Sequence, residues 1–280
     1  MFHISDNYLS SLMEEDLQLM DLTVMSMNIE SVPAMLECHP KKNCILAGVE
    51  EASRLFEKTG SSVEILCPSG SLTEGGQIFL RVRGTAGAIH SCWKQAQNIM
   101  EYSSGIATRT AAMLKNARTA NPSVHVSVTR KHFPGGKALS IKAALAGGAS
   151  IHRLGLSDSI LVFEQHRVFV NNFIGLIPVM AERFPEKKIA VEANSFEEAI
   201  AYVKAGTDVV QCERFEYDEL EKFVKIARGI NQSVKIAAAG GINASNAAEY
   251  AATGVDILVT SWVYFGKPED IKIVISREKQ

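Results

Sequence analysis

The second half of the chain repeats one pattern, in which a short run of apolar, mostly β-branched residues is followed by an amphipathic stretch. This alternation predicts strands separated by helices. The predicted strands are Val124–Val128, Ile160–Phe163, Lys188–Glu192, Asp208–Cys212, Lys235–Ala238 and Asp256–Thr260. Helices are predicted at Phe196–Ala205, Tyr217–Arg228 and Ala244–Ala252. Strands that are apolar throughout and alternate with helices are typical of a parallel sheet covered by helices.

An open doubly wound sheet and an α/β barrel would both produce this pattern. The residues at or near the carboxyl ends of the predicted strands distinguish the two, and they include Arg130, Glu192, Glu213 and the pair Gly240-Gly241. Barrel enzymes build their sites at the carboxyl ends of the strands. The placement of these charged and small residues therefore favours a barrel.

The residues before about Ser103 lack the regular alternation. A helix is predicted over Asp6–Leu19, followed by strands at Thr23–Asn28, Cys44–Val49, Ser62–Cys67 and Gln77–Val82 and by a long helix from about Ala86 to Tyr102. Glycines punctuate this part as turns. The prediction is an α+β domain over residues 1–106, an α/β barrel domain over residues 107–266, and a tail over residues 267–280 that packs back on the first domain.

Bulk composition excludes several classes of protein. The 280 residues include 46% hydrophobic and 21% charged side chains, with a formal net charge of −2. A nucleic-acid-binding protein carries a surplus of positive charge, which is missing here. No apolar run approaches the roughly 20 residues that span a bilayer, and the first residues show no secretory signal. We therefore expect neither a nucleic acid nor a membrane as a partner.

Cysteine usage points to a reducing compartment. The five cysteines are Cys38, Cys44, Cys67, Cys92 and Cys212, and none of them forms a CxxC pair. An odd number without metal-like spacing predicts reduced thiols and a cytoplasmic location.

The candidate chemistry is concentrated in two basic segments, Thr129–Gly135 and Gly147–Arg153. Each places a basic pair among glycine and proline residues near the end of a predicted strand. Glycine lets a backbone approach a ligand closely, and Arg and Lys bind carboxylate or phosphate oxygens. The alternative is a solvated basic turn. Two such pairs together favour a site for a compact, polyanionic small molecule.

Several motifs resemble those of the quinolinate phosphoribosyltransferase family, also called the nicotinate-nucleotide pyrophosphorylase family. They are Thr129-Arg130-Lys131-x-x-Pro134-Gly135, Gly147-Gly148, His152-Arg153-x-x-Leu156-x-Asp158, Ser104-Gly105-Ile106-Ala107-Thr108 and Ala239-Gly240-Gly241-Ile242. The closer resemblance is to the ModD branch, which is associated with molybdenum transport operons, because Arg-Lys-His-Phe-Pro-Gly and Leu161-Val162-Phe163-x-x-His166 are similar to that branch.

The resemblance implies an incomplete α/β barrel that transfers a phosphoribosyl group from phosphoribosyl pyrophosphate with Mg²⁺. It places Glu192 and Glu213 near the ribose hydroxyls and the metal, and Lys131 towards the phosphoribosyl donor. A glycine turn after a late barrel strand is a common phosphate site. Gly240-Gly241 and Ser261 are therefore the predicted phosphate-binding residues.

The acceptor side of the site is assigned in the same way. The resemblance places Arg130, His152 and Arg153 against the carboxylate of a heterocyclic acceptor; a structural His152 bonded to a backbone carbonyl is the alternative. It also implies a homodimer or higher homo-oligomer, in which Lys94 comes from the partner subunit.

Three positions depart from the quinolinate pattern. Phe163 replaces a site lysine, Trp93-Lys94 replaces a Glu-Arg pair, and Phe265 stands where a histidine is expected. These changes remove positive charge from the acceptor half of the site and add aromatic surface. A buried carboxylate without a partner costs several kcal/mol. We therefore expect the donor chemistry to be retained, with Phe163 contacting an acceptor that is not necessarily quinolinate.

Two other functions fit part of the pattern. A non-catalytic protein on the same scaffold would bind an oxyanion or a phosphometabolite in connection with molybdate transport. An aldolase or isomerase on a phosphate-binding barrel would use the glycine turn, but it fits the two basic pairs poorly. Pyrophosphate release on mixing with donor, Mg²⁺ and acceptors separates the transferase from the binding protein.

Overall fold

The computed structural model of the chain describes residues 2–278. These residues form two compact units. Unit 1 contains the residues up to Arg109, the segment Phe133–Gly148 and the residues from Gly266 onwards, and unit 2 contains Thr110–His132 and Ala149–Phe265.

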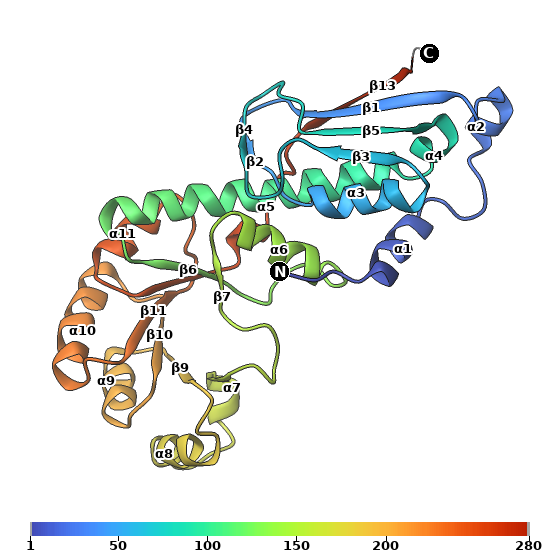
Figure 1. The fold of residues 1–280 in the computed structure, drawn as a ribbon. Coiled ribbons are helices and arrows are strands. Elements are labelled where there is room, and N and C mark those ends of the chain that lie inside the picture. Colours follow the sequence, from blue (N-terminus) through green and yellow to red (C-terminus); the bar gives the residue numbers. More distant parts are fainter. Residues whose placement is uncertain (1, 279–280) are drawn as a thin grey trace. The chain divides into compact units, whose positions relative to one another are not determined.

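Unit 1 is an α+β structure built on an antiparallel sheet (Figure 1). Four strands form this sheet in the order β13-β1-β5-β3, and β2 pairs with β4 separately. Its strands are β1 (Pro33–Pro40), β2 (Cys44–Ile45), β3 (Ser62–Ile65), β4 (Leu72–Thr73), β5 (Leu80–Thr85) and β13 (Ile271–Arg277). Its helices are α1 (Asp6–Glu14), α2 (Leu22–Met27), α3 (Val49–Lys58), α4 (Ala86–His90), α6 (Lys137–Ala146) and the first part of α5 (Trp93–Ala120).

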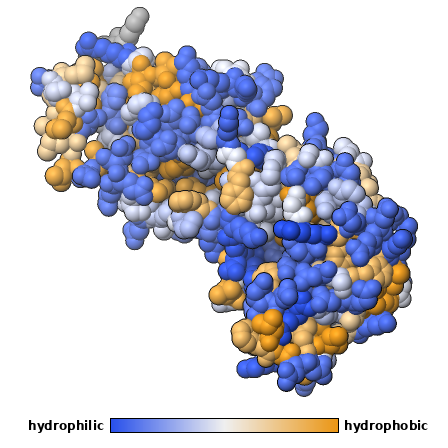
Figure 2. All heavy atoms as spheres, turned by 180° about the vertical axis from the view of Figure 1, so that it is seen from behind, coloured by the Kyte–Doolittle hydropathy of each residue, from blue (hydrophilic) through white to orange (hydrophobic). Residues whose placement is uncertain are grey.

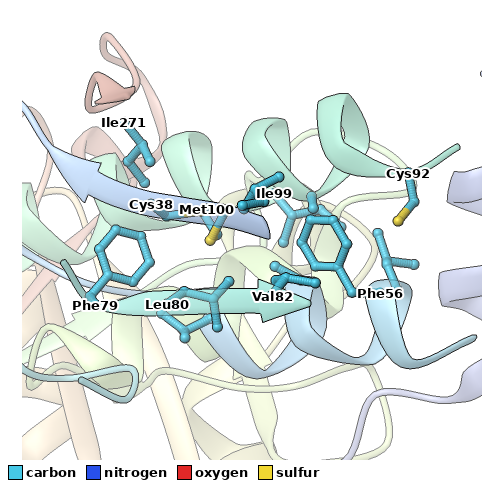
Figure 3. Packing of buried hydrophobic residues seen from close by; sticks show 14 of the residues in the cluster. Cys38, Phe56, Phe79, Leu80, Val82, Cys92, Ile99, Met100 and Ile271 are labelled. Atoms are coloured by element: carbon cyan, nitrogen blue, oxygen red, sulfur yellow. The ribbon is translucent and has the colours of Figure 1, made fainter. Parts of the chain in front are cut away.

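The core of unit 1 lies between the sheet and helices α3 and α5. Phe56 of α3, Val82 of β5 and Met100 of α5 belong to one buried cluster (Figure 3). Along β1, buried and partly buried side chains alternate, as expected for a strand with one face on a core. The last described strand, β13, pairs with β1 over seven residues, so that residues 271–277 are part of this sheet.

One predicted strand of unit 1 is wrong. Residues Thr23–Asn28 form helix α2 and not a strand. The Asp21 side chain accepts hydrogen bonds from the backbone N–H groups of Thr23 and Val24, and Asn28 ends the helix in the left-handed conformation. Helix capping at both ends therefore outweighs the apolar character of the segment.

The prediction at Cys44–Val49 is correct only for its first two residues. Strand β2 ends at Ile45, and α3 begins at Val49 after Gly48, whose φ is 78°. The buried face of α3 includes Val49, Leu55 and Phe56, and it shows a helical spacing that the strand prediction overlooked. Strand β1 was not predicted either, although its residues alternate in burial.

Unit 2 is a parallel sheet with helices around it, as predicted. Seven strands in the order β7-β6-β12-β11-β10-β9-β8 curl into a half-barrel, which confirms the predicted fold class (Figure 1). They are β6 (His125–Val128), β7 (Ser150–Ile151), β8 (Ile160–Val162), β9 (Ile189–Ala193), β10 (Val209–Glu213), β11 (Lys235–Ala239) and β12 (Ile257–Thr260). The helices are α7 (Glu164–Arg167), α8 (Phe173–Arg183), α9 (Phe196–Lys204), α10 (Tyr217–Ile230), α11 (Ala247–Ala252) and the short 3₁₀ helix η1 (Trp262–Tyr264), together with the second part of α5.

The six strands predicted for this part are confirmed, each to within one residue at either end. Small and β-branched side chains, among them Ala237, Ala239 and Val259, form a buried cluster on β11 and β12. Because two of these side chains are alanines, the middle of the sheet leaves space beside it.

An apolar surface remains exposed on α8 and the segment before it. It consists of Val168, Phe169, Ile174 and Val179, and Phe169 is 87% exposed. Hydrophobic residues gather at the lower end of the molecule in Figure 2, where α8 lies in Figure 1. Within residues 2–278, no helix is long and apolar enough to cross a membrane.

A buried charge cluster ties α6 to α3 within unit 1. The Lys142 ammonium lies 2.9 Å from Glu50 Oε2 and 2.8 Å from Glu51 Oε1, and the Glu51 side chain is only 3% exposed. Glu50 also accepts hydrogen bonds from the backbone N–H and the hydroxyl of Ser69. The positive charge of Lys142 thus offsets the negative charges of two carboxylates in the first turn of α3.

We expect Lys142→Met to lower the free energy of unfolding by about 3 kcal/mol, because it leaves a buried carboxylate without a partner. Chemical denaturation measures the change. The control is Lys225→Met, which removes an exposed pair with Glu221 on α10 and should cost about 0.5 kcal/mol or less. Equal effects of the two substitutions would contradict this account.

Candidate active site

A cavity of about 470 Å³ lies within unit 2 at the carboxyl ends of the curled strands. Its wall contains all ten site residues that the sequence predicted in this unit. They are Arg130, Lys131, His152, Arg153, Phe163, Glu192, Glu213, Gly240, Gly241 and Ser261. The structure therefore brings together side chains from β6 to β12 that are up to 131 positions apart, from Arg130 to Ser261.

The cavity wall contains four Arg and Lys side chains, of which Arg214 forms an ion pair with Glu213, with Nε 3.6 Å from Oε1. Arg130 and Lys131 follow β6, and Arg153 follows β7. In the part of the chain that the structure describes, no ion pair joins these three side chains to a carboxylate. Arg153 is only 7% exposed, and its burial, followed by the nearby Arg130 charge, lowers its pKa. A buried guanidinium beside a second one is stabilised by an anion, so this wall is suited to an anionic ligand.

The environment of His152 favours the neutral form of its imidazole. Burial lowers its pKa below the usual value of 6.5, and the charge of Arg153 acts in the same direction. Its backbone N–H donates to the carbonyl of Val128, which joins the end of β7 to β6. A neutral imidazole can donate one hydrogen bond to a ligand and accept another.

The acids lie on the neighbouring strands β9 and β10. Burial raises the pKa of Glu192, and the negative charge of Glu213 raises it further. The side-chain amide of Gln211 donates a hydrogen bond of 3.0 Å to Glu192 Oε2. Two carboxylates that repel each other across a cavity favour a cation between them.

The turn after β11 is shaped by its glycines. Gly240 and Gly241 have φ values of 93° and 78°, in the left-handed region. A Cβ atom on Gly240 would lie 2.4 Å from Arg214 Cγ and 2.8 Å from Glu213 Oε1, whereas a Cβ atom on Gly241 would meet nothing within 4 Å. Gly240 therefore allows the ends of β10 and β11 to approach each other, and Gly241 exposes its backbone.

Backbone hydrogen bonds connect the loops around the cavity. The Tyr264 hydroxyl donates to the carbonyl of Thr129 at 3.1 Å. The Thr260 hydroxyl donates to the carbonyl of Ile242 at 2.7 Å and accepts from the backbone N–H of Trp262 at 3.0 Å. These contacts fix the start of the basic loop and the residues after β11 and β12 in one arrangement.

Phe163 caps the end of β8, where the quinolinate pattern has a lysine. Its ring stacks on that of His166 with centroids 5.7 Å apart. The Arg153 guanidinium carbon lies 5.8 Å from the centroid of Phe163. The aromatic ring thus occupies this side of the cavity without adding charge.

Lys94 is the predicted site residue that lies in unit 1. It is on α5, where its ammonium donates to Gln97 Oε1 at 2.8 Å and lies 4.0 Å from the centroid of a Trp93 ring. Its contribution to the site of a partner subunit stays a prediction. Phe265, which stands where a histidine was expected, follows η1 and is 62% exposed.

The residues of the cavity wall that were not predicted as site residues include Gln211, Arg214 and Trp262. Gln211 precedes Glu213 by two positions on β10 and therefore faces the same side of the strand. Arg214 directly follows that strand and has a φ of 57°, which a non-glycine residue rarely adopts. Both positions carried a signal in the sequence, since a polar residue within an apolar strand and a charge at its end are typical of a site.

The described residues were compared with the ligand groups that hold metal ions in proteins. No group of three or more His, Cys, Asp or Glu side chains among residues 2–278 is arranged to hold a metal ion. A metal at Glu192 and Glu213 would therefore need further oxygens from a bound molecule, as Mg²⁺ in phosphate-binding sites commonly does.

Sequence comparison identifies similar proteins over the whole chain. The model of the quinolinate phosphoribosyl transferase N-terminal domain matches residues 21–104, and that of the C-terminal domain matches residues 106–274. The ModD protein of Pasteurella multocida is 34% identical over 282 residues, which cover 99% of this chain and 100% of that protein. The ModD protein of Rhodobacter capsulatus is 38% identical over 250 residues, covering 89% of this chain and 96% of that protein. These matches confirm the resemblance to the family and to its ModD branch.

Solved structures of the same fold include two with TM-scores of 0.90. One is NadC from Streptococcus pyogenes, which is 21% identical, with 98% of this chain and 97% of that chain covered. The other is the nicotinate-nucleotide pyrophosphorylase from Francisella tularensis, also 21% identical, with 98% of each chain covered. At this level of identity the likeness establishes the fold.

The two glycines of the turn provide a matched pair of variants. We expect Gly241→Ala to cost about 1 kcal/mol of stability, because alanine in the left-handed region is strained. Gly240→Ala should cost about 1 to 3 kcal/mol more, because its Cβ overlaps Arg214 and Glu213. Chemical denaturation of both variants tests the difference. Equal costs would show that the ends of β10 and β11 separate freely.

Proposed function

The chain belongs to the quinolinate phosphoribosyl transferase family, and we propose that it transfers the phosphoribosyl group of phosphoribosyl pyrophosphate to a ring nitrogen of an anionic aromatic heterocycle. The observation that carries the proposal is the charge distribution of the cavity. Unpaired cations lie after β6 and β7, a pair of carboxylates lies on β9 and β10, and a glycine turn lies between them on β11.

The reaction makes one bond to the ribose and breaks another. The lone pair of the ring nitrogen forms a bond to C1 of the ribose, while the bond from C1 to the pyrophosphate oxygen breaks and its electrons leave with the pyrophosphate. Positive charge develops on the sugar and negative charge on the leaving group. Glu192 and Glu213 would stabilise the positive charge on the sugar, and Lys131 would stabilise the negative charge on the leaving pyrophosphate.

The polar groups of the other strands would orient the substrates. The exposed backbone of Gly241, together with Ser261, would hold the 5′-phosphate, which a glycine turn at the end of a late barrel strand is suited to do. Arg130 and Arg153 would bind the carboxylate of the acceptor in a bidentate manner. Neutral His152 would donate a further hydrogen bond to it.

Mg²⁺ is the proposed cofactor, with Glu192 and Glu213 as its protein ligands. Two carboxylates with substrate phosphates and water are a common ligand set for this ion. The pair fits a cation because burial and the charge of Glu213 disfavour the ionised form of Glu192 when no cation is bound. The ion would supply positive charge for the leaving pyrophosphate.

We also propose a homo-oligomer in which Lys94 completes the site of a partner subunit. The exposed apolar surface at Val168, Phe169, Ile174 and Val179 supports association, since contiguous exposed apolar side chains commonly mark protein interfaces.

Binding of the donor should depend on Mg²⁺. We expect phosphoribosyl pyrophosphate to bind at least about tenfold more tightly with Mg²⁺ than without it, and Glu213→Gln to lose most of this difference because it removes one of two carboxylate ligands. Isothermal calorimetry measures both affinities. The matched control is Glu221→Gln on α10, an exposed pair with Lys225, which should retain the dependence. Equal binding with and without the metal, unchanged in Glu213→Gln, would contradict the proposal.

The acceptor should differ from quinolinate. Because Phe163 supplies no charge for a second carboxylate, we expect poor turnover of quinolinate by the wild-type protein and a rise of about tenfold or more in Phe163→Lys, alone or with Phe265→His. A pyrophosphate-release assay measures this activity. Ile226→Lys, at an exposed position of α10, adds the same charge elsewhere and should change nothing. Efficient turnover of quinolinate by the wild-type protein would contradict the proposed change of acceptor.

A further inference from the structure

One polar atom in the wall of the cavity has no partner. Gln211 is only 5% exposed, and its side chain lines the cavity. Its carbonyl oxygen, Oε1, is buried and accepts no hydrogen bond from any described residue. A buried carbonyl without a donor costs about 1 to 3 kcal/mol, and such atoms are rare in folded proteins.

The orientation of this amide is fixed by its other end. The Gln211 amide nitrogen, Nε2, lies 3.0 Å from Glu192 Oε2. Rotating the amide by 180° would place its carbonyl oxygen against Glu192 Oε2, and these two acceptors repel each other when the carboxylate is ionised. The carbonyl oxygen is therefore the end that stays free, and Glu192 holds it there.

The neighbouring strands offer this oxygen no donor. Gln211 lies opposite Glu192 on β9 and opposite Ala237 on β11. A carboxylate accepts hydrogen bonds, and an alanine side chain forms none. Glu213, two positions further along β10, lies on the same face of the strand and is also an acceptor when ionised.

We propose that Gln211 is a specificity-determining residue whose carbonyl oxygen accepts a hydrogen bond from a neutral O–H or N–H group of the substrate. Two parts of the substrates carry such groups, namely the ribose hydroxyls of the phosphoribosyl donor and an amino or ring N–H group of the heterocyclic acceptor. The choice of these two sources rests on the proposed function. In either case Gln211 would favour a substrate with a hydrogen-bond donor at this position over a substrate with a further negative charge there.

Two variants distinguish the role of the Gln211 carbonyl oxygen from that of its amide nitrogen, which donates to Glu192. Gln211→Met has a similar length and removes both contacts. Gln211→Lys keeps a donor for Glu192 and removes the acceptor. Thermal unfolding of both variants verifies that they are folded. The measured quantity is the ratio of the affinities of two probes of equal charge. A variant that changes the binding of all anions equally leaves this ratio unchanged.

The probes form two matched sets. Ribose 5-phosphate and 2-deoxyribose 5-phosphate differ in one ribose hydroxyl, and nicotinate and its 2-, 5- and 6-amino derivatives differ in one amino group. Calorimetry with the wild-type protein should show a preference of about tenfold for the probe with the donor in one of the sets. Both variants should reduce that preference to about onefold. The set that responds identifies the source of the donor.

Three results would overturn the inference. In the first, the wild-type protein binds none of the probes or shows no preference in either set. In the second, the preference survives in Gln211→Met. In the third, the preference survives in Gln211→Lys. The last would show that Gln211 acts only by holding Glu192. These outcomes are independent of the proposed function, because the ratios are measured without Mg²⁺ or pyrophosphate release.

Discussion

The order of the strands in the half-barrel places the cations that follow β6 and β7 and the two glutamates of the cavity on different strands. The cations follow β6 and β7 at one end of the sheet, and the two glutamates lie on β9 and β10 towards the other. The ends of β11 and β12, which lie between them, contribute only uncharged residues to the part of the cavity wall that the structure describes. Opposite charges that touched would neutralise each other. Because no ion pair joins Arg130, Lys131 or Arg153 to a carboxylate within residues 2–278, these three cations remain available to an anionic ligand.

This separation is maintained by the backbone. Thr129 and Thr260 anchor the loops after β6 and β12 through hydrogen bonds to Tyr264 and Ile242. Gly240 lets the end of β11 approach Glu213 more closely than any other residue would. The cavity is therefore formed before a ligand binds, and a preorganised site loses less free energy on binding than one that must first be ordered.

The barrel strands could be predicted from the sequence because a buried strand is apolar over nearly its whole length, as in residues 236–239 of β11. In unit 1 the strands have one buried face, and short apolar segments do not distinguish strand from helix. The capping by Asp21 and Asn28 decided the structure of α2. Motifs at strand ends located most of the cavity wall. Gln211 was not predicted because it lies inside a strand and not at its end. Its place in the cavity wall follows from the strand face that it shares with Glu213.

The pairing of β13 with β1 also affects how the protein folds on the ribosome. Strand β1 ends at Pro40, yet one of its two neighbours in the sheet, Ile271–Arg277, is synthesised more than 200 residues later. Until then β1 is an edge strand with unpaired backbone groups, which can pair with another chain. The barrel strands, by contrast, are complete once Thr260 has left the ribosome. The unit that begins first along the chain is thus the last to be completed, and nascent chains are exposed to aggregation at β1 for most of their synthesis.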